Sequence, residues 1–171
     1  GAYMMNLGDP IKVSISNFFG IEINDFAVSV AATALWIAES QMWHETENLV
    51  QFDGEFLPLK TNNNIHNSNA FAIEWQSVIS ANELNYIIGN PPFVGARYMS
   101  DSQKSDKAKV FGADWKNIGS LDYVSCWIYK SMQFMSENTD LKAAIVATNS
   151  VCQGEQVPAL WAPLFDKGIT I

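Results

Sequence analysis

The sequence contains few cysteines, few histidines and little charge, and these shortages exclude several classes of protein. Only Cys126 and Cys152 occur in 171 residues, which excludes the disulfide framework of a small secreted domain and favours a reduced cytoplasmic setting. His44 and His66 stand apart from each other and from both cysteines, so we expect no metal site. No uninterrupted apolar run reaches the ~18 residues that a membrane-spanning helix needs, so we expect no membrane partner.

Positive charge is also scarce. Ten basic residues against 18 acidic ones give a net charge of -8, which argues against a free-standing nucleic-acid-binding module. The basic residues are unevenly placed, because five of them fall in one short stretch that is net positive: Arg97, Lys104, Lys107, Lys109 and Lys116.

Hydrophobic residues, by contrast, make up 48% of the chain, with six Trp and ten Phe. This composition predicts a folded core, and the length predicts one domain over residues 1–171. Apolar runs alternate with helical patterns, which predicts an α/β fold with a mostly parallel sheet flanked by helices. Three buried strands are expected, at 17–21, 86–89 and 142–147. A short strand near Ile65, in the turn-rich stretch 53–69, and one beginning at 169 are also expected.

Three helices are expected between these strands. The first is capped by Asn24 or Asp25 and buries Phe26, Val30, Ala34 and Ile37; the second begins at Asp122 and buries Val124, Trp127, Ile128, Ser131 and Met135. The third spans 153–165, is distorted by Pro158 and ends before Gly168. Residues 94–120 have the charged composition of a long loop, which suggests a functional segment.

Polar residues follow several of the expected strands. Glu22, Asn90 and the pair Thr148–Asn149 fall at carboxyl ends, where open parallel sheets place their chemistry. Asn90 opens the tetrapeptide Asn90-Pro91-Pro92-Phe93. The prolines stiffen the backbone and remove two amide donors, the asparagine offers an amide oxygen, and the phenylalanine offers a stacking face. Two acceptors beside one aromatic ring suit a planar ring that carries an amine, although an ordinary turn after a strand would also explain the tetrapeptide.

The motif and the segments around it resemble the amino-methyltransferases that use an Asn-Pro-Pro-Tyr/Phe motif. More narrowly, they resemble the adenine-specific DNA methyltransferases of type IIG and type IIL restriction-modification enzymes of bacteria. The matching segments occur in family order and cover most of the chain: 18–39, 57–75, 86–100, 121–135 and 143–157.

The resemblance implies methyl transfer from S-adenosylmethionine to the exocyclic amine of adenine in DNA, without a metal. It implies that Asn90, Pro91, Pro92 and Phe93 form the catalytic pocket for a flipped base. It also implies that Glu22 binds the cofactor ribose, although a helix-entry cap would also explain this residue. The other implied site residues are Ile23, Asn69 and Ala70 for the cofactor, and Arg97, Lys104, Lys107 and Lys109 for DNA. An ordinary turn would explain Asn69-Ala70-Phe71 nearly as well. The resemblance further implies that Asp122-Tyr123 and the helix after them help to wall the site, although an ordinary amphipathic helix would explain most of these residues.

The sequence departs from the family in one respect. The glycine-rich cofactor motif that precedes the Glu22 strand has no match in residues 1–16, where Gly8-Asp9-Pro10 reads as a turn. No target-recognition domain is expected either. We therefore expect the isolated chain to bind the cofactor poorly and to be inactive by itself. In the family the absent strand lies between the strands of Phe19 and Ile87, so we also expect self-association through exposed strand edges.

Three alternatives stay open on the sequence alone. Protein glutamine methyltransferases present the same pocket to a side-chain amide, although the basic stretch and the segment TNSVCQGEQ (148–156) favour DNA. A non-catalytic remnant would also fit a chain without the glycine-rich motif. A nicotinamide-binding domain is disfavoured because no GxGxxG occurs.

Overall fold

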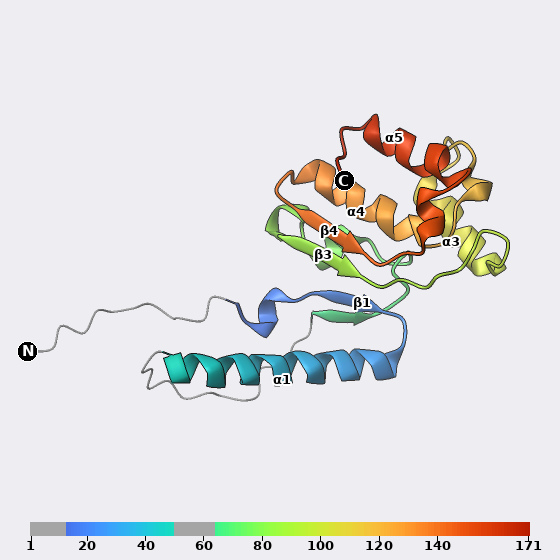
Figure 1. Cartoon of the computed structure of the whole chain (residues 1–171). Helices are drawn as coiled ribbons and strands as arrows, with labels where there is room; N and C mark the ends of the chain where they lie inside the picture. Colours follow the sequence, from blue (N-terminus) through green and yellow to red (C-terminus); the bar gives the residue numbers. More distant parts are fainter. Residues whose placement is uncertain (1–12, 50–63) are drawn as a thin grey trace, which may run out of the picture. The chain divides into compact units, whose positions relative to one another are not determined.

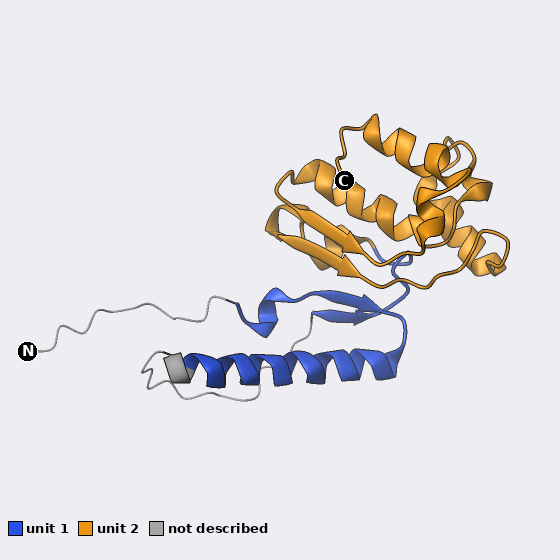
Figure 2. Cartoon of the chain, viewed as in Figure 1, with its two compact units in different colours: residues 1–73 blue, residues 74–171 orange. Residues whose placement is uncertain are grey.

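The computed structural model of the chain describes residues 13–49 and 64–171. It divides into two compact units, residues 1–73 and 74–171, here called unit 1 and unit 2 (Figure 2). The turn expected at Gly8–Pro10 and most of the turn-rich stretch after Asp53 lie outside the described residues. The helices and strands, labelled as in Figure 1, are β1 (Gly20–Glu22), α1 (Asp25–Leu49), β2 (Ile65–Asn67), α2 (Trp75–Val78), β3 (Tyr86–Gly89), α3 (Asp101–Phe111), α4 (Ser125–Glu137), β4 (Lys142–Ile145) and α5 (Ala162–Phe165).

The α/β prediction is confirmed, because both described sheets are parallel. In unit 1, β1 pairs with β2, with Ile21 opposite His66. In unit 2, β3 pairs with β4, with Gly89 opposite Ile145. Each described sheet has two strands.

Unit 1 consists of β1, β2 and the long helix α1. The expected strand 17–21 begins later than predicted, because Asn17 ends a 3₁₀ turn, Ile15–Asn17. Asn24 caps α1 as predicted, since its side-chain oxygen accepts a 3.0 Å hydrogen bond from the Ala27 amide.

The predicted buried face of α1 is wrong. The structure exposes Phe26 (74%), Val30 and Ile37, and turns Ala27 and Leu35 toward the strands instead. Ala34, the fourth predicted residue, is also exposed, although it lines the same hollow as Ala27 and Leu35. Apolar side chains lie on several sides of this helix, so their spacing alone does not select the side that packs.

Unit 2 has a core built around α4, which lies along one face of β3 and β4 (Figure 1). The predicted helix after Asp122 is confirmed, with Val124, Ile128 and Ser131 buried and Trp127 and Met135 half-buried. The most deeply buried large side chains of unit 2 are Phe134, Leu121, Leu141, Leu160 and Leu164. On β3 only alternate residues face this core, so the expected fully buried strand is wrong: Tyr86 and Ile88 face outward, and Ile88 is 82% exposed.

Two further sequence expectations for unit 2 need correction. Residues 94–120 contain the eleven-residue helix α3 rather than one long loop. Residues 169–171 form no strand, because no described strand pairs with them. The helix expected at 153–165 starts later, as a π-helix (Val157–Trp161) that contains Pro158 and continues into α5.

The remaining short elements are 3₁₀ turns at Ala81–Glu83, Ile118–Ser120 and Asn149–Cys152. Within the described part of the chain, no helix is both long enough and apolar enough to span a membrane.

Candidate active site

The tetrapeptide Asn90-Pro91-Pro92-Phe93 directly follows the last residue of β3. The end of this strand is held to the segment after β4, because the Val146 amide donates a 2.9 Å hydrogen bond to the Gly89 carbonyl. Since β3 and β4 are parallel, Asn90 and the Thr148–Asn149 pair follow the same edge of the sheet, as the sequence predicted. Pro91 is buried, whereas Asn90, Pro92 and Phe93 are exposed. The backbone is thus anchored at the first proline while the polar and aromatic groups around it face outward.

Two oxygens of the tetrapeptide are available as acceptors. Among the hydrogen bonds made by the described residues, none engages the Asn90 side chain or the Pro91 carbonyl. The Pro92 carbonyl differs, because it accepts a 3.1 Å hydrogen bond from the Val94 amide in a tight turn around Phe93. The Phe93 side chain is 52% exposed. The segment therefore offers two unused acceptors and one accessible ring within four residues.

The chain after Phe93 is tied to the start of α4. The Tyr123 amide donates a 2.9 Å hydrogen bond to the Val94 carbonyl. The Ala96 amide donates a 2.8 Å hydrogen bond to Asp122 Oδ1. The resemblance assigned Asp122 and Tyr123 only to a wall of the site, but the structure shows that both hold the Asn-Pro-Pro-Phe segment in place.

The Asp122 carboxylate also reaches the segment after β4. Its Oδ2 accepts 2.7 Å hydrogen bonds from Ser150 Oγ and from Gln156 Nε2. The Gln156 amide closes a ring, since its Oε1 accepts a 3.1 Å bond from the Asp122 amide. Burial raises the pKa of Asp122, but the hydrogen bonds from Ser150, Gln156 and Ala96 and the Lys107 ammonium together hold that pKa below its usual range.

The basic residues expected to contact DNA divide into two groups. Arg97, Lys104 and Lys109 are exposed, so their charges are accessible. Lys107 is a correction to the sequence prediction, because it is only 5% exposed and its Nζ donates a 2.8 Å hydrogen bond to the Leu121 carbonyl. Burial lowers the pKa of Lys107, an effect that Cys126 and Asp122 partly oppose. The Lys107 ammonium therefore stabilises the core of unit 2 and is not accessible to DNA.

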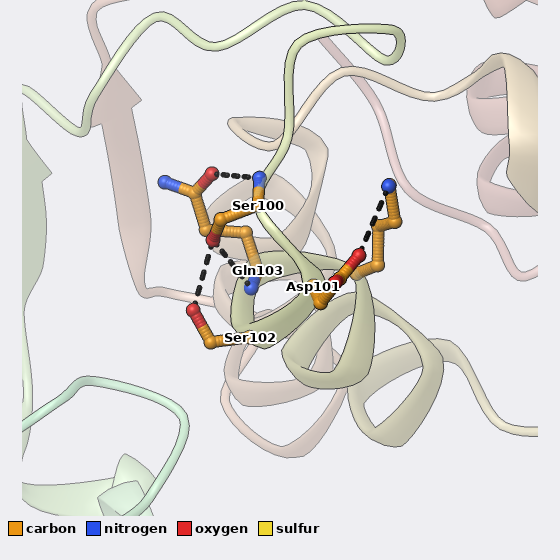
Figure 3. A network of polar contacts seen from close by, with 5 residues as sticks. Ser100, Asp101, Ser102 and Gln103 are labelled. Carbon is orange, nitrogen blue, oxygen red and sulfur yellow. Dashed lines mark hydrogen bonds and ion pairs between the residues drawn. The ribbon is translucent and has the colours of Figure 1, made fainter.

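The helix that carries these lysines has a well-defined start (Figure 3). Ser100 Oγ accepts a 3.3 Å bond from the Gln103 amide, and Gln103 Oε1 accepts a 2.9 Å bond from the Ser100 amide. This reciprocal pair is a capping box. The Lys104 ammonium pairs with Asp101 at 3.3 Å on the surface. The capping box fixes the first turn of α3 shortly after the Asn-Pro-Pro-Phe segment.

The residues expected to bind the cofactor lie in unit 1. Glu22 ends β1, and its Oε1 accepts a 2.8 Å bond from the Asn24 amide at the entry of α1. Ile23 beside it is 70% exposed. Asn69 Oδ1 accepts a 2.9 Å bond from the Phe71 amide, so Asn69 and Ala70 belong to a turn.

Two hollows are bordered by described residues other than those of the tetrapeptide. The first, in unit 1, has a volume of about 470 Å³ and is mainly apolar, with Glu22 at its border together with Phe18, Ala27, Ala31, Leu35 and Ile65. The second, in unit 2, has a volume of about 400 Å³ and lies along α4, bordered by Glu74, Tyr129, Lys130, Glu137 and Lys167. An acid at a strand end beside an apolar hollow fits a ribose next to a planar base. Among residues 13–49 and 64–171, no cluster of three or more His, Cys, Asp or Glu side chains could hold a metal.

Sequence reasoning did not single out Ser150 or Gln156. Both act through Asp122, which lies 28 and 34 residues away from them along the chain. The stretch TNSVCQGEQ (148–156) follows a strand end and is rich in polar residues, which is the signal that could have identified them.

Comparison with known proteins connects this geometry to a family. Residues 3–171 match the family model described as the DNA-methyltransferase domain of MmeI. A DNA methyltransferase A from Bacillus subtilis (strain 168) is 46% identical over 163 residues, which cover 94% of this chain and 18% of that protein.

The chain is also similar to a solved structure of an MmeI protein. The type IIL restriction-modification enzyme MmeI, in complex with DNA, is similar with a TM-score of 0.83 and 38% identity, over 92% of this chain and 21% of that one. The chain thus spans about a fifth of the length of each of these two proteins.

Proposed function

The chain belongs to the family of MmeI-type DNA-methyltransferase domains, and from this membership we propose that it supplies the target-base pocket of an adenine-specific enzyme. The reaction would transfer a methyl group from S-adenosylmethionine to the exocyclic amine of adenine in DNA, as part of a restriction-modification system. The whole chain, residues 1–171, would form part of one catalytic domain of a longer bacterial protein, acting in the cytoplasm where the DNA is.

The observation that carries the proposal is the state of the Asn90-Pro91-Pro92-Phe93 segment. Its two acceptors are unused and its ring is accessible, while Pro91 is buried and the flanking residues are hydrogen-bonded. A segment that served only as a turn would not need an accessible ring beside two unpaired acceptors. An adenine flipped out of the duplex carries one amine with two N–H groups on a flat ring, which matches this arrangement.

The residues of the chain would act by binding and orientation. The Asn90 amide oxygen and the Pro91 carbonyl would each accept one hydrogen bond from the target amine. These bonds draw the amine lone pair out of conjugation with the ring and hold it in one direction. The Phe93 ring would stack on the flipped base and exclude water from one side. S-adenosylmethionine, when bound, supplies the electrophilic methyl group.

The cofactor would be held by residues of unit 1. The Glu22 carboxylate would accept hydrogen bonds from the ribose hydroxyls, and Ile23 would contact the adenine of the cofactor, with Asn69 and Ala70 bordering it. The fit is supported by the exposed Ile23 and by the apolar hollow that Glu22 borders. Because the sequence of residues 1–16 has no match to the family's glycine-rich motif, we expect the isolated chain to bind the cofactor poorly and to be inactive.

DNA is the proposed macromolecular partner. Arg97, Lys104 and Lys109 are exposed in or before α3, in the same unit as the tetrapeptide, and would contact phosphates. The isolated chain would also associate with itself, since both described sheets have two strands each.

The function is tested with the full-length protein that contains this chain. Tritium-labelled S-adenosylmethionine is supplied with DNA and, separately, with a protein that carries an exposed glutamine. Label in DNA that co-migrates with N6-methyl-2′-deoxyadenosine after digestion supports the proposal. Label only in the protein, or in cytosine, would refute it.

A further inference from the structure

The Asp122 carboxylate connects three segments that meet at the carboxyl ends of β3 and β4. It accepts one hydrogen bond from the Ala96 amide, six residues after Asn90, and two from side chains that follow β4, Ser150 Oγ and Gln156 Nε2. All three donor–acceptor distances lie between 2.7 and 2.8 Å, typical of bonds to a charged acceptor.

We propose that Asp122 is the positioning residue of the Asn-Pro-Pro-Phe segment, holding it in the geometry that receives the target amine. This proposal rests on the proposed function. Asp122 acts through the Ala96 backbone, whose amide donates to its carboxylate.

The bonds around the segment explain why one carboxylate can have this effect. At its start, the segment is held by the bond between the Val146 amide and the Gly89 carbonyl. At its end, it is held by Asp122 through the Ala96 amide and by the Tyr123 amide through the Val94 carbonyl. Between these anchors Pro91 and Pro92 restrict the backbone. Fixing both ends of a stiff segment fixes the direction of the Pro91 carbonyl oxygen and the position from which the Asn90 side chain extends.

Asp122 also links the two anchors to each other. Val146 belongs to the segment after β4, and that same segment supplies Ser150, which donates to Asp122 Oδ2. The two strand ends, the tetrapeptide and the start of α4 therefore form one closed set of contacts. Gln156, itself only 8% exposed, donates to the carboxylate and accepts from the Asp122 amide, which sets the carboxylate direction.

The test compares Asp122→Asn and Asp122→Ala with the control Asp140→Asn in the full-length protein. Asp140 is an exposed aspartate before β4, at the other end of the strand, and its carboxylate makes no described contact. Asp122→Asn keeps one acceptor oxygen but loses the charge and cannot accept all three bonds. If Asp122→Ala does not fold, the measurements on Asp122→Asn still test the proposal.

Two measurements are made on each variant. Hydrogen exchange of the peptide that contains Ala96 reports whether the segment is held, and kcat for DNA methylation is read separately from KM and corrected for the folded fraction. We expect exchange at the Ala96 amide to rise at least tenfold and kcat to fall about 10- to 100-fold, as for a misplacement of about 1 Å. KM for cofactor and DNA should change less than threefold, and Asp140→Asn should resemble the wild type.

The outcomes separate this inference from the proposed function. Unchanged exchange at Ala96, or faster exchange with wild-type kcat, would overturn the role of Asp122 while methylation persists. A loss of activity that matches only the loss of folded protein would also overturn it. A wild-type protein that methylates no DNA would instead refute the proposed function.

Discussion

The Lys107 ammonium donates a 2.8 Å hydrogen bond to the carbonyl oxygen of Leu121 within the core of unit 2. Both residues are buried, with Leu121 fully inaccessible. Lys107 is therefore unlike its neighbours Lys104 and Lys109 on α3, which are exposed. This difference within one helix separates a structural lysine from two lysines that can reach a phosphate.

The first prediction uses this difference. Replacing Lys104 or Lys109 with alanine in the full-length protein should each lower the slope of log affinity against log salt by about 1, because one phosphate contact is lost. Fluorescence anisotropy of a labelled duplex over a salt series measures the slope.

Lys107→Met is the matched control, because it removes a charge that cannot reach DNA. Its slope should equal that of the wild type, and its stability should fall by about 1–3 kcal/mol through the unpaired Leu121 carbonyl. If all three variants had the same slope as the wild type, Lys104 and Lys109 of α3 would not contact DNA phosphates.

The second prediction concerns Asn90. Asn90→Ala should lower kcat for methylation by about 10²–10³-fold, the usual effect of deleting one positioned hydrogen-bonding group at a reacting centre. DNA affinity should stay largely unchanged, because the exposed Asn90 amide is not among the phosphate contacts. Methyl incorporation and duplex binding are measured on the same preparation. Asn82→Ala, at an exposed asparagine before β3, provides the control. Wild-type methylation by Asn90→Ala would show that the tetrapeptide is only a turn.

The third prediction concerns the ring of Phe93. Phe93→Ala should weaken capture of the flipped base by about 1–3 kcal/mol, the usual contribution of a base stacked on an aromatic side chain. A duplex with 2-aminopurine at the target position reports the flipped state by its fluorescence. Phe93→Tyr keeps the ring and should retain most of the signal. Equal signals from the alanine and tyrosine variants would exclude stacking on Phe93.

Features that depend on neighbouring residues could be predicted from the sequence, whereas those that depend on contacts between distant residues could not. Asn90-Pro91-Pro92-Phe93 was found because its chemistry is local and its position after an apolar strand is visible in the sequence. The Asp122 contacts were not predicted, since they join residues 26 to 34 positions apart. Helix α3 was missed because its surface is charged, although its capping box and the following Gly112, at φ 75°, are both readable signals of a helix.

The error on α1 has a different cause. Phe26, Val30 and Ile37 have helical spacing, but so do Ala27, Ala31 and Leu35, and the second set borders the hollow beside β1. Large apolar side chains contribute more to a hydrophobic periodicity than alanines do, so the periodicity predicted the wrong side of α1 as buried. The small side chains on this side let α1 approach β1 and β2 closely. The closer packing then determines which side of α1 faces the strands.

The fourth prediction concerns association of the isolated chain. We expect it to form dimers or larger species at micromolar concentration, because two-stranded parallel sheets expose strand edges and Ile88 is open on the outer face of β3. Light scattering coupled to size exclusion measures the mass. Ile88→Lys should shift the population toward monomer, while Asn82→Lys adds the same charge away from that face and should not. A monomeric wild-type chain at this concentration would contradict the prediction.

The fifth prediction concerns the two cysteines, which differ in burial and so in reactivity. Cys126 is fully buried at the start of α4, and burial raises its pKa to about 12, with Lys107 opposing the shift and Asp106 adding to it. Cys152 is exposed. At pH 8 a thiol-reactive dye should therefore modify one site per chain rapidly and the other at least 100-fold more slowly, because the thiolate is the reacting form. The Cys152→Ser variant should lose the fast phase, and Cys126→Ala the slow one.

The pH dependence of the slow phase follows from the direction of the shift. The raised pKa leaves little Cys126 thiolate at neutral pH. At any pH below about 12, raising the pH by one unit should therefore increase the thiolate population, and hence the intrinsic labelling rate, about tenfold. The increase should continue from pH 8 to pH 10 without a plateau while the chain stays folded, as circular dichroism would verify. If the slow rate instead levelled off near pH 8.5, the ordinary range for a solvated thiol, Cys126 would be reacting from an open state. The core around Leu121 and Lys107 would then be looser than the structure describes.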